Sequence, residues 1–150
     1  MTQLRNATVA RLTLMLVLFI STGAAIAAPV QARLYHNPGC MCCEQYADYL
    51  NAKGYEVDVL DTDDMAALNE KHGVEPALSS CHTTLIGDYV VVGHVPEPVV
   101  AKLLREEPDI RGIALPGMPS GSPGMPGKKS EPLLFGFVIK TLGGDVYTTH

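Results

Sequence analysis

The chain has 150 residues, of which 47% are hydrophobic and 18% are charged, and its formal net charge is -5. This length favours one domain over two, and the apolar share is ordinary for a folded chain, which excludes wholesale disorder. With 16 acidic residues against 11 basic ones, the chain has no cationic surface for phosphates, which argues against nucleic acid or an anionic membrane as a partner. The four cysteines are the most informative residues that remain, and the role expected of them depends on the cellular compartment.

The N-terminal segment has the pattern of a secretory signal peptide. Two arginines and no acid accompany an apolar run over Leu12–Ile20, and small residues then lead to Ala25-Ile26-Ala27, which matches an A-x-A cleavage site. The apolar run is shorter than the roughly 20 residues that a bilayer span needs, so an uncleaved anchor is the less favoured alternative. We predict a signal peptide over 1–27, a single exported domain over 28–150, a periplasmic or otherwise exported location, and no stable membrane span after cleavage.

Hydrophobic alternation and turn residues predict a β-α-β-α order over the first half of the exported domain. The predicted elements are strands over Ala32–His36 and Tyr55–Leu60 and helices over Cys40–Lys53 and about 63–72. Thr62 or Asp63 is the predicted cap of the second helix. The cysteine cluster therefore opens the first helix, directly after the first strand.

The second half of the chain predicts two strands, a helix, a loop and a hairpin. The predicted elements are strands over Cys81–Ile86 and Tyr89–Gly93, a helix between Pro96 and Pro108, a loop over Leu115–Gly127, and a C-terminal hairpin of Leu133–Lys140 with Asp145–Thr149. The loop is rich in glycine, proline and methionine, a composition that no regular element accommodates. The order β-α-β-α-β-β-α is that of an α/β thioredoxin-like fold with a central mixed sheet, although a fold alone does not define a function.

Cys40-Met41-Cys42-Cys43 is the sharpest local signal in the chain. It holds a C-x-x-C pair and a C-x-C pair at the start of a helix, where free N–H groups and the helix dipole favour thiolate over thiol. Cys81 opens a central strand, and in a thioredoxin-like fold the loop before that strand faces the start of the first helix. We therefore expect the fourth sulfur to reach the other three.

Structural disulfides, zinc and disulfide exchange are alternative interpretations of these cysteines. An even number in an exported chain favours two disulfides, but only Cys40–Cys43 with Cys42–Cys81 avoids an obviously strained bridge. Structural zinc sites usually come as two separated C-x-x-C pairs, and only one is present. In a thiol-disulfide oxidoreductase, Cys40 would attack the substrate disulfide and Cys43 would resolve the mixed disulfide, which leaves the other two cysteines unused.

A soft-metal site for Cu(I) gives all four cysteines a role. Cu(I) accepts irregular or clustered thiolate sites and also binds thioethers. Met118 and Met125 lie on the glycine- and proline-rich loop, where there is little core for them to fill. His94, between a strand and a helix, is the best histidine candidate for a ligand. His82 adjoins Cys81 but would point to the opposite face of an extended strand, which makes it the weaker candidate.

Four ordered motifs resemble those of the exported CopG-like metal-binding proteins. They are Cys40–Cys43, Ser80–Thr83, Gly93–Pro96 and Pro116–Met125. The resemblance implies a thioredoxin-like fold, a role in copper resistance, Cu(I) binding through cysteines, and copper redox activity. The residues onto which it carries metal binding are Cys40, Cys42, Cys43, Cys81, His94, Met118 and Met125. Met41 is a departure, because many members have glycine there, and tyrosines stand in the following helix where many have tryptophan.

We therefore predict an exported protein that sequesters or relays Cu(I), in copper homeostasis or resistance, with copper ions and other exported copper-handling proteins as its partners. The alternative is a thiol-disulfide oxidoreductase with Cys40 and Cys43 as catalytic residues. A hybrid, in which copper and the dithiol exchange electrons, would use the same residues.

Overall fold

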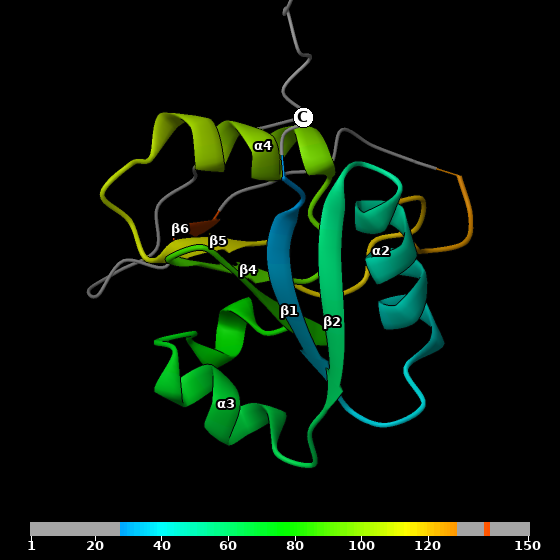
Figure 1. Cartoon of the computed structure of the whole chain (residues 1–150). Coiled ribbons are helices and arrows are strands. Elements are labelled where there is room, and N and C mark those ends of the chain that lie inside the picture. The colour runs from blue at the N-terminus through cyan, green and yellow to red at the C-terminus, as the bar shows by residue number, and fades with distance from the viewer. Residues whose placement is uncertain (1–27, 129–136, 139–150) are drawn as a thin grey trace, which may run out of the picture.

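A computed structural model describes residues 28–128 and 137–138 of the chain, which form a mixed α/β domain (Figure 1). The elements are β1 (Val30–His36), α2 (Met41–Asn51), β2 (Tyr55–Asp61), α3 (Met65–Lys71), a 3-10 helix (Pro76–Leu78), β3 (His82–Ile86), β4 (Tyr89–Val92), α4 (Glu97–Glu106), β5 (Gly112–Ala114) and β6 (Phe137–Val138). The predicted signal peptide lies outside the described residues. Within the described residues, no helix combines the length and apolar character that a membrane span requires.

Within the described residues, the sheet has six strands in the order β2-β1-β3-β4-β5-β6. β1 and β2 are parallel and are joined through α2, whereas β3 is antiparallel to both of its neighbours. β4 and β5 are again parallel, and α4 makes the crossover between them. The predicted order β-α-β-α-β-β-α and the mixed α/β class are therefore confirmed, and the thioredoxin-like description of the fold rests on this order.

Three details differ from the prediction. Asp64 caps α3, since its Oδ1 accepts a hydrogen bond of 2.8 Å from the backbone N–H of Ala67; the predicted cap, Thr62 or Asp63, is wrong by one or two residues. β5 was not predicted, because three residues are too few to show alternation. β6, from the first strand of the predicted hairpin, pairs with β5, while the second strand of that hairpin lies outside the described residues.

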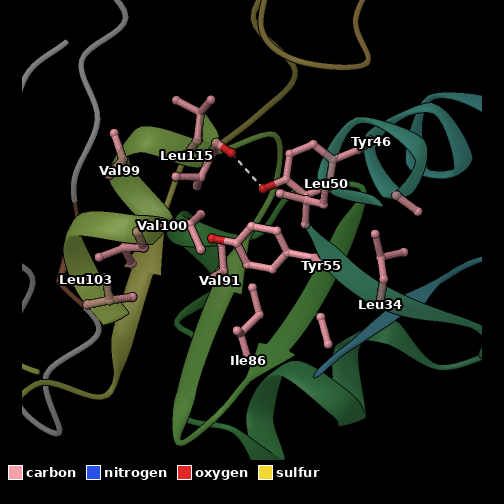
Figure 2. Close-up of a cluster of buried hydrophobic side chains, with 14 of the residues drawn as sticks. Leu34, Tyr46, Leu50, Tyr55, Ile86, Val91, Val99, Val100, Leu103 and Leu115 are labelled. Carbon is pink, nitrogen blue, oxygen red and sulfur yellow. Dashed lines mark hydrogen bonds between the residues drawn. The ribbon is translucent and has the colours of Figure 1, made fainter. Parts of the chain in front are cut away.

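Two apolar clusters lie on the two faces of the sheet, and alternation along β4 separates them. Val91 belongs to the larger cluster, with side chains from α2 and α4, whereas Val90 and Val92 belong to the smaller one, with Val74 and Leu78. Figure 1 shows α4 and α3 on opposite sides of the sheet, and Figure 2 shows the larger cluster. The first turn of α2 is thereby held against the edge of a well-packed core.

The packing of α4 gives a stability prediction with an internal control. Leu103 is fully buried in the larger cluster, while its neighbour Leu104 is only partly buried. Leu103→Ala should lower the free energy of unfolding by about 2–5 kcal/mol, because it removes packed methyl groups and leaves a cavity. Leu104→Ala should cost clearly less. Chemical denaturation measures both, and equal losses would contradict this assignment of the buried face.

Candidate metal centre

The sheet register brings the four cysteines together. The last residue of β1, His36, pairs with the first residue of β3, His82, so the turn that leads into α2 lies beside the segment that enters β3. The four sulfur atoms all lie within 4.8 Å of one another, and they belong to Cys40, Cys42, Cys43 and Cys81. The fourth sulfur therefore reaches the other three, as the sequence predicts.

The four sulfurs are in two chemical states. Cys40, the N-cap residue of α2, forms a disulfide with the buried Cys43, while Cys42 and Cys81 are free. The Sγ atoms of Cys42 and Cys40 lie 3.5 Å apart. The centre thus offers two thiols in this state, and a two-electron reduction of the disulfide would raise the number to four.

Cys81 also lies between two imidazole rings. Its Sγ is 3.0 Å from Nε2 of His94 and 3.3 Å from Nδ1 of His82. The Nδ1 atom of His94 lies 2.7 Å from the carbonyl oxygen of Pro123, which can only accept a hydrogen bond, so Nδ1 carries the proton. In the neutral ring, Nε2 of His94 then presents its lone pair to Cys81, which is the orientation that a metal ligand needs.

The side chain of His82 does not point away from Cys81, and the prediction that it would is wrong. Cys81 precedes β3, and β3 begins only at His82, so strand alternation does not govern this pair. The His82 ring is fully buried, with its centroid 4.7 Å from that of Tyr46 and 4.7 Å from that of His94. His82 therefore joins the centre. Had the predicted strand begun at His82 and not at Cys81, the sequence would not have placed the two side chains on opposite faces.

Burial keeps these donor groups uncharged in the metal-free protein. Burial first, and the neighbouring Cys42 second, raise the pKa of Cys81 to about 12. Burial first, and the neighbouring His94 second, lower the pKa of His82 to about 3. Burial also lowers the pKa of His94, against the opposing effect of its hydrogen bond to the Pro123 carbonyl. Neutral imidazole is the form that binds a metal, whereas Cys81 must release a proton when it does so.

The two methionines of the loop occupy different surroundings. Met125 lines a hollow of about 420 Å³ that Cys42 also lines. Met118 is 56% exposed and is not among the residues that line this hollow. Metal ligation by either methionine stays a prediction, and of these two it is Met125 that lines the hollow beside Cys42.

A mixed α/β domain that gathers four sulfurs and two neutral imidazoles at one end of its sheet has the donor set of a soft-metal-binding protein. Residues 78–125, which include Cys81 and His94, match the family described as "Protein of unknown function, DUF411". Two solved structures, described as copper resistance protein CopG in form 2 and form 1, are each 34% identical to this chain, with TM-scores of 0.74 and 0.73. Each match covers 81% of this chain and 98% of the other.

The chain belongs to the CopG family of copper resistance proteins, which confirms the resemblance found in its motifs. Among curated proteins, none matches the chain. The family and the cysteine cluster together support a role connected with copper.

The raised pKa of Cys81 gives a pH prediction for the metal-free protein. In a Cys42→Ser variant with the Cys40–Cys43 disulfide intact, Cys81 is the only free thiol, and the substitution removes the second cause of its raised pKa but not the first, which is burial. Because the thiolate is the nucleophile, alkylation by iodoacetamide should keep accelerating above pH 9, the ordinary pKa of the group. Mass spectrometry measures the rate, and the same variant in denaturant serves as the control. A plateau at or below pH 9 in the folded variant would contradict the raised pKa.

Proposed function

We propose that this protein binds Cu(I), to sequester or relay it, through thiolates and the imidazole of His94. The proposed thiolate ligands are Cys40, Cys42, Cys43 and Cys81. One observation carries the proposal: Cys81 Sγ lies within 4.8 Å of the other three sulfurs and also 3.0 Å from Nε2 of His94. The sulfur of Cys81 therefore lies close both to the other three sulfurs and to the imidazole of His94.

The donor chemistry supports Cu(I) over hard cations. The two candidate groups within the described residues contain sulfur and imidazole nitrogen donors, which suit soft and borderline metals, and no carboxylate. Zn²⁺ also accepts cysteine and histidine ligands, so it is the competing metal. Membership of a copper resistance family favours copper between these two.

The cellular setting is part of the same proposal. The predicted signal peptide supports export, and other exported copper-handling proteins would then exchange copper with this one. In an oxidising compartment, thiols crowded within 4.8 Å of each other form disulfides readily, and bound Cu(I) would protect them.

The direct test is Cu(I) uptake by reduced protein under anaerobic conditions, in competition with a chromophoric Cu(I) chelator. The wild type should take Cu(I) from the chelator, and His94→Gln should weaken binding by about tenfold or more, since it removes a ligand nitrogen that is already oriented. His72→Gln, at the C-cap of α3, is the matched control and should bind as the wild type does. Failure of the wild type to take up Cu(I), or stronger retention of Zn²⁺ than of Cu(I), would refute the proposal.

A thiol-disulfide oxidoreductase is the second candidate, and the Cys40–Cys43 disulfide at the start of α2 favours it. Cys40 is partly exposed and Cys43 is fully buried, which is the arrangement of an attacking and a resolving thiol. Cys42 and Cys81 take no part in that reaction.

Comparison of oxidised and reduced protein separates the two functions. If the cysteines act as copper ligands, the protein with an intact Cys40–Cys43 bond should bind fewer Cu(I) ions than the reduced protein, because two sulfurs are withheld. Copper analysis of the two desalted forms measures the difference, and insulin reduction without metal should be negligible. Equal copper contents, with robust insulin reduction, would favour the oxidoreductase.

A further inference from the structure

His94 lies at the centre of a tight turn between β4 and α4. The backbone N–H of Val95 donates a 2.8 Å hydrogen bond to the carbonyl oxygen of Gly93, and a bond that spans one residue in this way defines a γ-turn. The backbone N–H of Gly93 donates a 3.0 Å bond to the carbonyl oxygen of His82. The direction of the His94 ring therefore depends on how this turn, Gly93–Val95, is held in place.

Tyr46 holds the turn from the side of the cysteine helix. Its side chain comes from α2, shortly after Cys43, and is 0% exposed. Its hydroxyl donates a 2.6 Å hydrogen bond to the carbonyl oxygen of Val95, the last residue of the turn (Figure 2). Because Val95 directly follows His94, this one hydrogen bond ties the helix that carries the clustered cysteines to the backbone beside the imidazole.

The ring of Tyr46 also packs against both imidazoles of the centre. Its centroid lies 4.7 Å from that of His82, and 5.5 Å from that of His94, with an angle of 75° between the planes in the second pair. The two imidazoles meet edge to face at 81°, with their centroids 4.7 Å apart. Such ring contacts have preferred directions, so the three rings restrict one another's orientation. Tyr46 thus contacts both the His94 ring and the backbone beside it.

Packing alone does not require the hydroxyl of Tyr46. A phenylalanine would fill the same space and would bring no polar group into the core. The hydroxyl instead satisfies the carbonyl of Val95, itself a buried residue, and a buried carbonyl without a partner is costly. This contact joins the segment that carries the clustered thiols to the segment that carries the imidazole. Their relative placement must be accurate if one metal ion is to touch both.

We infer that Tyr46 is a positioning residue of the metal centre, which keeps Nε2 of His94 directed at Cys81 before a metal arrives. It does so through its hydrogen bond to the carbonyl of Val95. Tyr46 is not itself a ligand, since its hydroxyl proton is engaged by that carbonyl. It acts through His94, as a partner that orients a ligand. The inference rests on the proposed function, in which His94 is a ligand.

The metal-free protein gives the first test, by ¹⁵N NMR of its histidine rings at a pH where imidazole is neutral. Wild-type His94 should show one tautomer, with the proton on Nδ1, because that atom donates to the carbonyl of Pro123. Tyr46→Phe removes only the hydroxyl, and the His94 signals should move toward the average of the two tautomers as the turn loosens. Tyr89→Phe, at the start of β4, is the matched control and should leave His94 unchanged, since its hydroxyl also donates to a backbone carbonyl, that of Pro108.

A second variant keeps the test informative if Tyr46→Phe does not fold. 4-Aminophenylalanine at position 46 puts an N–H donor where the hydroxyl stood, so the single Nδ1–H tautomer of His94 should be retained. The inference is overturned by unchanged His94 signals in folded Tyr46→Phe protein. It is also overturned by averaged His94 signals in the folded 4-aminophenylalanine variant.

Cu(I) affinities then separate positioning from general stabilisation. Reduced protein competes anaerobically with a chromophoric Cu(I) chelator, and Tyr46→Phe should weaken binding by about tenfold, as loss of a partner that orients a ligand does. In a His94→Gln background the same change should weaken binding much less, because the ligand on which Tyr46 acts is absent. An equal loss in both backgrounds would overturn the inference, because a change that only loosens the fold does not depend on His94.

The outcomes also separate this inference from the proposed function. If the wild type binds Cu(I), His94→Gln binds it more weakly and Tyr46→Phe binds it as the wild type does, the inference alone fails. If the wild type takes up no Cu(I), or if His94→Gln binds as the wild type does, the proposed function fails and the inference fails with it.

Discussion

The burial of Tyr46 is the constraint on which the metal centre depends. Its side chain is 0% exposed, and its hydroxyl donates a 2.6 Å hydrogen bond to the carbonyl oxygen of Val95 (Figure 2). Its ring centroid lies 4.7 Å from that of His82 and 5.5 Å from that of His94. Burial raises the pKa of Tyr46 well above its ordinary value, so the hydroxyl stays a donor. Because Tyr46 lies one turn beyond the cysteines on α2, it fixes the cysteine turn against the two imidazoles.

The loop after β5 closes the other side of the centre and depends on the same helix. Gly124 has a φ of 77°, and its backbone lies against that of Tyr46 and Cys42, where a side chain would clash. The neighbouring residue, Pro123, accepts the hydrogen bond from Nδ1 of His94. One short segment of the loop therefore sets the tautomer of a candidate ligand and forms a wall of the hollow beside Cys42.

The centre couples metal binding to protons and to thiol redox state. Cys81 is held as a thiol by burial, so a metal ion must displace its proton, and the neutral imidazoles beside it need lose none. The Cys40–Cys43 disulfide withholds two of the four sulfurs. The proposed storage or relay of copper, and the alternative electron exchange with it, would use these same groups.

Local sequence patterns predicted much of the fold and, in the metal centre, the cluster of three cysteines. Alternating strands, helix periodicity and turn residues predicted the order of elements, because those signals depend on neighbours in the chain. The three cysteines could be recognised in the same way, because they lie within four consecutive residues at the start of a helix. Once the order of elements was known, topology alone placed Cys81 beside that cluster.

The remaining features were decided by tertiary structure, because they depend on contacts between distant segments. His82 joins the centre only because β3 begins one residue later than the alternation suggests. β5 is too short to carry a pattern and exists through its pairing with β4. The loop has no periodicity, so its sequence does not tell Met125, which lines the hollow with Cys42, from the exposed Met118. The sequence by itself therefore determined which donor types are present and where the cysteines meet. Only the tertiary structure placed His82 beside Cys81 and Met125 in the hollow with Cys42, since a side chain's neighbours across the fold are set by packing and not by spacing along the chain.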